Sequence, residues 1–294
     1  MRSPRPGRLI VLATLAVIVG AVFLGALNTA GRYSGLTVPA RIPDDLAAIL
    51  RPHMTRVLPT GEGPFPTALL FSGCDGVRDN PGRWAEALAA AGWASIIVDS
   101  HAARGLDTLQ KWRLICAGQV FQGSERAGDV ATALAVARTW PDVDAGRLAL
   151  VGASHGGWAV MEFLSAADRD AVPPGLTRWP GDGAPLDGVQ AAVLFYPYCG
   201  ELSHAARRGW TKELPVLFLL AEDDTITDET DCLAVADRAT RDGLPVRAHV
   251  YPNVTHGFDQ REKAPFSTLG HDAAAAEDAI SRMVDVITGT GPPR

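Results

Sequence analysis

The residues best suited to chemistry in this chain form a turn centred on a serine. The stretch Gly152-Ala153-Ser154-His155-Gly156-Gly157 follows an apolar, strand-like run and precedes a helical pattern. A G-x-S-x-G spacing between a strand and a helix is typical of a strained turn that exposes the serine hydroxyl as a nucleophile. The flanking glycines are needed because a Cβ there would collide with the neighbouring strand or helix. The stretch therefore predicts Ser154 as a nucleophile, with a glycine turn that merely packs helix on strand as the alternative.

A serine nucleophile needs a base, and the base needs a carboxylate to orient it. The sequence supplies both later in the chain, in the expected order. Glu222-Asp223-Asp224 follows one apolar run. The next apolar run opens the stretch "VRAHVYPNVTHGFD" (Val246–Asp259), which contains His256. His256 is the predicted base. Asp223 and Asp224 are both candidates for the acid, and the residue pattern alone does not separate them.

The elements that must position these groups alternate between apolar strands and helices. Strands are predicted at Ala68–Ser72, Ser95–Asp99, Leu148–Gly152, Ala191–Tyr196, Val216–Ala221 and Val246–Tyr251, with a weaker one near Met54–Leu58. Helices are predicted at Gly82–Ala91, Ser124–Thr139, His155–Ala167, Glu229–Asp242 and His271–Ile287. Continuous apolar strands alternating with helices favour a doubly wound α/β fold with a mostly parallel sheet and helices on both faces. Reactive groups then gather at the carboxyl ends of the strands.

The N-terminus differs from the rest of the chain. Arg2, Arg5 and Arg8 precede an uncharged apolar run from Leu9 to Leu27, which is long enough to span a bilayer. Basic residues on its N-terminal side predict that the remaining chain is exported, to the periplasm or the cell exterior. A membrane anchor is the first interpretation, a cleaved and secreted form the second, and a buried core helix the weakest. The predicted organisation is an anchor or signal segment at 1–30, a linker at 31–50 and an enzyme domain at 51–290.

Composition limits the possible partners. The formal net charge of −6 and the scattered basic residues argue against nucleic acid. We expect no cofactor, because the chain has neither G-x-G-x-x-G after its first strand nor a Walker-type lysine loop, and no metal, because metal-ligand spacings are missing. Four cysteines in an exported domain suggest disulfides.

Together these segments resemble the dienelactone hydrolase family of α/β-hydrolases, over about Thr67 to Phe258. The resemblance is carried by "LLFSGCDG", "VDSHAARG", "VGASHGG", "FYPYCG", "AEDDTIT" and "YPNVTHGFD". In the family pattern, the acid position falls on Asp223 rather than Asp224. The chain departs from the namesake enzymes at two places, since Ser154 stands where they carry a cysteine and Ser72 replaces the histidine usual before Gly73.

The resemblance implies a hydrolase that cleaves an ester or lactone through Ser154, His256 and Asp223, with an acyl-enzyme intermediate. It implies backbone N–H donors to the oxyanion from Cys74 and His155, and it makes Arg104 a candidate ligand for a substrate carboxylate. The usual strand order of the fold would also pair Cys74 with Cys116 and Cys199 with Cys232. The alternatives are an exported peptidase or carbohydrate acetyl esterase of the same fold, and a catalytically silent, membrane-tethered binding protein.

Overall fold

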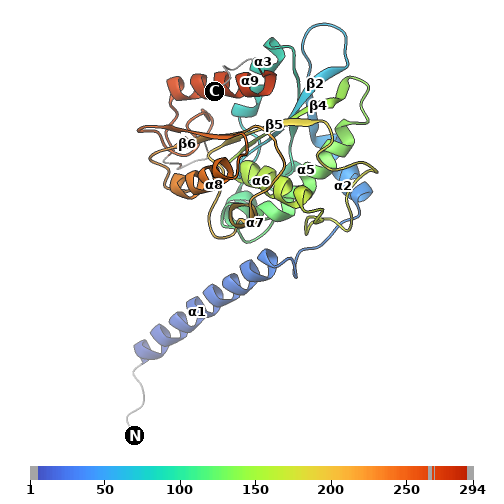
Figure 1. Cartoon of the computed structure of the whole chain (residues 1–294). Helices are drawn as coiled ribbons and strands as arrows, with labels where there is room; N and C mark the ends of the chain where they lie inside the picture. Colours follow the sequence, from blue (N-terminus) through green and yellow to red (C-terminus); the bar gives the residue numbers. More distant parts are fainter. Residues whose placement is uncertain (1–5, 264–266, 268, 290–294) are drawn as a thin grey trace.

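The computed structural model describes residues 6–263, 267 and 269–289 of the chain. Arg2 and Arg5 of the predicted basic flank, and residue 290 at the predicted domain end, lie outside these described residues. Within them the chain forms one long N-terminal helix and a three-layered α/β domain (Figure 1).

The centre of the domain is a seven-stranded sheet of order β1-β3-β2-β4-β5-β6-β7. Only β1 runs antiparallel to its neighbour, β3; the other pairs are parallel. The strands are β1 (Met54–Val57), β2 (Phe65–Phe71), β3 (Ala94–Val98), β4 (Val143–Ala153), β5 (Val189–Phe195), β6 (Val216–Ala221) and β7 (Val246–Tyr251). Strands β2 and β6 are buried along most or all of their length because helices cover both faces of the sheet, as their continuous apolar runs predicted.

Two separate apolar cores lie on the two faces of the sheet. On one face pack α3 (Asn80–Ala90) and α9 (Ala273–Thr288). The other face is covered by α2 (Pro43–Leu50), α5 (Gly123–Ala137), α6 (His155–Asp168), α7 (His204–Arg208) and α8 (Glu229–Arg241) (Figure 1). This arrangement is the doubly wound α/β-hydrolase fold that the sequence predicted. The excursion after β3 carries three short helical turns, η2 (Ala102–Arg104), α4 (Thr108–Gln110) and η3 (Lys111–Cys116), and another short turn, η1 (Arg51–His53), precedes β1.

The segment predicted as a linker is partly helical and partly buried. Helix α2 starts with Pro43 in its first turn, where a missing N–H costs nothing, and Asp44 and Asp45 follow at the positive end of the helix dipole. Leu46 and Leu50 are 1% and 0% exposed and belong to the core. The folded domain therefore begins before residue 51, and the linker is shorter than predicted.

Helix α1 (Pro6–Tyr33) leaves the domain as a single rod (Figure 1). Its segment Ile10–Tyr33 is the one helix among the described residues that is long and apolar enough to cross a membrane, with a mean hydropathy of 2.8. Its large apolar side chains are exposed, which excludes the core-helix interpretation. Its C-terminal end contacts the domain through an Asn28–Gln119 hydrogen bond and an Arg32–Glu125 ion pair.

Candidate active site

The serine turn connects β4 to α6 in a backbone conformation that few non-glycine residues adopt. Ser154 has φ 51° and ψ −117°. A Cβ on Gly152 would lie 2.5 Å from the Gly156 carbonyl oxygen, and a Cβ on Gly156 would lie 2.3 Å from the Phe71 carbonyl oxygen. Glycine at 156 therefore lets the turn lie against the end of β2, and glycine at 152 lets it lie against the first turn of α6, as the sequence spacing suggested.

The predicted base meets the serine directly. His256, in the loop after β7, places Nε2 2.9 Å from the Ser154 Oγ. Its other ring nitrogen, Nδ1, lies 2.7 Å from Oδ2 of Asp224. In the tautomer that fits both contacts, Nδ1–H donates to the carboxylate and Nε2 accepts the serine proton. The ring of Tyr196 packs edge-on against His256, with centroids 4.6 Å apart, and holds the imidazole in place.

The acid position predicted from the family pattern is wrong by one residue. The side chain of Asp223 is exposed. Its backbone N–H donates to the Val254 carbonyl, and this hydrogen bond links the loop after β6 to the loop after β7. Asp224 instead turns inward with a side chain only 1% exposed. Its Oδ1 accepts the N–H groups of Ile226 and Thr227, at 2.9 and 2.8 Å, so the turn itself aims Oδ2 at His256.

The charge state of Asp224 follows from these contacts. Burial by itself raises the pKa of this carboxyl. The hydrogen bond and charge of His256, together with the two backbone N–H donors, outweigh burial and hold the pKa below its usual value. The carboxylate is therefore ionised at neutral pH and faces the imidazole as an anion.

The two expected oxyanion donors lie beside the serine. Cys74 and His155 both line a 220 Å³ cavity together with Ser154. A Cβ on Gly73, next to Cys74, would lie 3.7 Å from the Ser154 Cβ, so the loop after β2 passes directly over the serine. In the part of the chain that the structure describes, neither backbone N–H has a hydrogen-bond partner, which leaves both available to a bound oxygen.

A buried arginine, not predicted from the sequence, links the end of β2, two residues before Cys74, to the His155 side chain. Arg126 of α5 is 0% exposed, and its Nη1 donates both to the Ser72 carbonyl, at 2.7 Å, and to Nδ1 of His155, at 3.0 Å. Burial lowers the pKa of Arg126 to about 10, so it remains charged at neutral pH. Burial and Arg126 lower the pKa of His155 to about 3, so this ring stays neutral and donates Nε2–H to the Phe121 carbonyl. A lone arginine in an alanine-rich helix was the available sequence signal.

A second unpredicted contact supports the base. The Tyr196 hydroxyl donates to the fully buried carboxyl of Asp259, which also accepts the indole N–H of Trp84 at 2.9 Å. Asp259 follows directly on "THGF", so it lies only three residues beyond His256. Burial raises the pKa of the Asp259 carboxyl. This cluster fixes the ring that packs on the imidazole.

Arg104 does not reach the serine. Its guanidinium forms a bidentate pair with buried Asp129, at 2.8 Å for both contacts, and lies over the Phe121 ring with a separation of 3.8 Å. It is not among the residues that line the cavities at Ser154, so its predicted role as a substrate ligand is wrong. His101 is 1% exposed and also lines neither cavity.

Both expected disulfides are present and close loops at this end of the sheet. Cys74 is bonded to Cys116, and Cys199 to Cys232. The first ties the loop over the serine to the excursion after β3, because β2 and β3 are neighbours in the sheet. No group of three or more His, Cys, Asp or Glu side chains within residues 6–263, 267 and 269–289 is arranged to hold a metal ion.

Two cavities adjoin at the serine and share Cys74, Cys116, Ser154 and Ile226 in their walls. The 220 Å³ cavity continues past Ser154 to Trp158, Gly118 and Leu202. A second one, of 260 Å³, contains Ser154 and His256 and is bounded by Trp112 and Ile226. The two cavities therefore offer adjoining space to a substrate held at Ser154.

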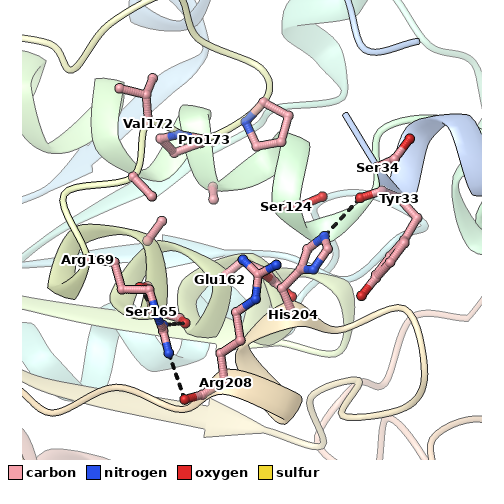
Figure 2. A pocket seen from close by; sticks show the side chains of 14 residues that line it. Tyr33, Ser34, Ser124, Glu162, Ser165, Arg169, Val172, Pro173, His204 and Arg208 are labelled. Carbon is pink, nitrogen blue, oxygen red and sulfur yellow. Dashed lines mark hydrogen bonds between the residues drawn. The ribbon is translucent and has the colours of Figure 1, made fainter. Parts of the chain in front are cut away.

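A third cavity, of 340 Å³, does not contain the serine. Figure 2 shows it between the end of α1, with Tyr33 and Ser34, and arginines 169 and 208 near α6 and α7.

Comparisons with known proteins show which family and which solved structures the chain is similar to. Residues 182–290 match the family model of the dienelactone hydrolase family. A solved candidate dienelactone hydrolase from Klebsiella pneumoniae superposes with a TM-score of 0.60 at 17% identity, over 80% of this chain and 92% of that one. Esterase 2 of Thermogutta terrifontis, phosphorylated by paraoxon, gives 0.59 at 14% identity, over 82% and 90%. A dienelactone hydrolase-like promiscuous phosphotriesterase from metagenomic libraries gives 0.54 at 18%, over 81% and 98%.

A curated protein also matches part of the chain. Adenylosuccinate synthetase of Kineococcus radiotolerans is 30% identical over 101 residues, which is 30% of this chain. The chain spans only 23% of the length of that protein. This short match therefore carries no argument about activity.

Proposed function

We propose that this chain, which resembles the dienelactone hydrolase family over residues 182–290 and shares the α/β-hydrolase fold, is a serine hydrolase of carboxylic esters and lactones. The observation that carries the proposal is the continuous contact from Ser154 Oγ to His256 Nε2 at 2.9 Å, and from His256 Nδ1 to Asp224 at 2.7 Å. A glycine turn that only packs a helix on a strand would not require Ser154, His256 and Asp224 to be in contact. A histidine that is only buried in the core would not require it either.

In the proposed reaction, His256 takes the Ser154 proton while Oγ attacks the ester carbonyl. Asp224 stabilises the imidazolium that forms, and the N–H groups of Cys74 and His155 bind the oxyanion. Collapse breaks the acyl–oxygen bond, and the leaving alcohol takes the proton from His256. Water, deprotonated by the same imidazole, then releases the acid and restores the serine.

The test is hydrolysis of p-nitrophenyl acetate by the full-length protein and by Ser154→Ala. We expect turnover to fall by at least about 10³-fold, because the nucleophile is lost while binding and oxyanion donors remain. Thermal unfolding of both proteins controls for loss of fold. Turnover by the alanine variant equal to that of the parent would refute the proposal. A parallel panel of peptides and acetylated sugars separates an esterase from a peptidase or a carbohydrate acetyl esterase.

We also propose that α1 is retained as a membrane anchor on an exported enzyme. Residues 28–34 are built into the domain: Arg32 pairs with Glu125 at 2.8 Å, and the Tyr33 ring stacks on His204 at 4.1 Å. Cleavage after Ala30 would remove the helix that orients these contacts. The two disulfides suit an oxidising compartment. Amino-terminal sequencing of the protein purified from membranes should find residues 1–30 still attached; a chain starting at residue 31 in the soluble fraction would contradict this.

A further inference from the structure

Two exposed apolar residues line the cavity at the serine, and two more flank one of them in the sequence; we call these four residues the apolar rim. The rim consists of Leu109, Trp112, Leu114 and Ile226, which are 62%, 41%, 36% and 53% exposed. Trp112 and Ile226 line the 260 Å³ cavity at the serine, and Leu109 and Leu114 flank Trp112 in the sequence. Single exposed apolar residues are ordinary, but a group of them at the mouth of a site marks a surface that contacts something.

The excursion after β3, which carries the rim residues Leu109, Trp112 and Leu114, also contacts the apolar helix α1. The Gln119 carbonyl accepts a hydrogen bond from Asn28 at 2.6 Å, and a Cβ on Gly25 would lie 3.7 Å from the Gln119 side chain. Gly25 lies inside the uncharged run that ends at Leu27. The Gln119 N–H donates to the carbonyl of rim residue Leu114 at 2.8 Å. The rim is thus attached to the point where the apolar part of α1 ends.

The 220 Å³ cavity lies against the same point. Its wall includes Gly118, whose carbonyl accepts a hydrogen bond from the Gln122 side chain at 3.2 Å. The same side-chain amide donates to the Thr29 carbonyl of α1 at 3.4 Å. One side chain therefore separates the wall of a cavity that contains Ser154 from the end of the apolar helix.

Positive charge lies next to the end of α1. Tyr33 is six residues past Leu27, about 9 Å along a helix axis, which is close to the roughly 5–8 Å depth of a headgroup layer. The Arg207 guanidinium lies 4.9 Å from the centroid of the Tyr33 ring. Arg169 and Arg208 line the cavity beside Tyr33 in Figure 2. Arginines at this level suit phosphate groups of a bilayer surface.

We infer that the rim lies on the bilayer in which α1 is anchored, and that the substrate is a long-chain carboxylic ester dissolved in that leaflet. The inference rests on the proposed function, since it assigns the substrate class of the same site. The ester enters between Trp112 and Ile226, and Ser154 attacks its carbonyl. The acyl–oxygen bond breaks, the alcohol leaves with the proton held by His256, and water completes the hydrolysis.

The first test compares two esters on the full-length protein in phosphatidylcholine vesicles. One ester is water-soluble p-nitrophenyl acetate, and the other is p-nitrophenyl palmitate dissolved in the vesicles. The variant Leu109→Glu with Leu114→Glu changes rim residues that line neither cavity. We expect palmitate hydrolysis to fall about tenfold, because charged side chains leave the membrane surface, while acetate hydrolysis stays within about twofold.

Leu58→Glu is the matched control. Leu58 is 47% exposed and follows β1, whose C-terminal residue Val57 pairs with Ser95 at the amino-terminal end of β3, away from the site. It should leave both esters unaffected. If the rim variant hydrolyses both esters like the parent, or loses both equally, the membrane-facing entrance is refuted while ester hydrolysis stands.

The second test does not depend on activity. Leu109→Cys and Leu58→Cys are each labelled with a fluorophore in the full-length protein, and spin-labelled lipids are added to the vesicles. We expect quenching at position 109 and none at position 58. Quenching at 109 supports the orientation even if no ester is cleaved, in which case only the proposed function fails. No quenching at 109, or shielding of 109 by added unlabelled protein instead, would overturn the inference in favour of a rim exposed to water or covered by a second copy.

Discussion

Replacing Asp224 with asparagine tests the arrangement of the acid. The carboxylate is 1% exposed, with Oδ2 2.7 Å from His256 Nδ1. Asparagine has nearly the same size, so it keeps the packing and can still accept the N–H groups of Ile226 and Thr227. It removes the negative charge opposite the imidazolium, and its amide can stabilise the wrong tautomer of the ring.

We expect Asp224→Asn to lower kcat by about 10³–10⁴-fold, as found when the acid of a serine triad is neutralised. At 1.36 kcal/mol per tenfold, this loss corresponds to about 4–5 kcal/mol of transition-state stabilisation. The size is consistent with the structure, because His256, which lies between this carboxylate and the serine, is only 7% exposed and little water can substitute for the missing charge.

The assay is kcat and KM for p-nitrophenyl acetate, with Asp223→Asn as the matched control. Asp223 is adjacent, carries the same charge and is exposed, so its substitution should change kcat by no more than about threefold. Thermal unfolding checks that both variants are folded. A larger loss of kcat from Asp223→Asn than from Asp224→Asn would refute Asp224 as the acid and would restore Asp223, the position given by the family pattern.

Three further outcomes follow from the geometry of the site. Gly156→Ala should prevent folding or abolish activity, since its Cβ would lie 2.3 Å from a β2 carbonyl, while Gly82→Ala, with nothing within 4 Å, should unfold at the same or a higher temperature. The free energy of unfolding should fall as pH drops from about 6.5 toward 3, with His155 contributing at most about 1.4 kcal/mol per pH unit. The reason is that the pKa of His155 is lowered in the folded protein, so the unfolded chain takes up the proton first. Denaturant titrations at several pH values should show a weaker dependence of this free energy on pH for His155→Gln. Replacing both Cys74 and Cys116 with serine should lower kcat by about 10-fold to 10²-fold, with a smaller change in KM. The reason is that the loop carrying the Cys74 N–H donor loses its covalent link to the excursion after β3. An unchanged kcat would mean that this loop keeps its position without the disulfide.

Much of the fold could be predicted from the sequence because its strands are continuous apolar runs. Strands β6 and β7 begin and end at the predicted residues, and the others differ by a few residues at their ends. Helix α2 was missed because eight residues with two prolines nearby show no sustained period, and its two buried leucines become visible only when the helix packs against α5. Helix α7, with five residues, is shorter still.

The site was predictable where backbone geometry dictates the residue type. The close approach of β2 requires glycine at 156, and the close approach of the first turn of α6 requires glycine at 152, so the G-x-S-x-G spacing indicates both. The choice between Asp223 and Asp224 depends instead on which side chain a tight turn points inward, and adjacent residues of one type carry no signal for that. The role of Arg104 failed for a similar reason, because its partner Asp129 lies 25 residues away on another helix.

The role of Ser154 as the nucleophile is tested most directly by the site at which an organophosphate modifies the protein. The full-length protein is treated with paraoxon, digested and mapped by mass spectrometry, with Ser154→Ala treated in parallel. We expect a single phosphorylated residue, Ser154, together with loss of ester hydrolysis in proportion to labelling, and no label on the variant. Full inactivation with Ser154 unmodified, or equal labelling of Ser154→Ala, would contradict it.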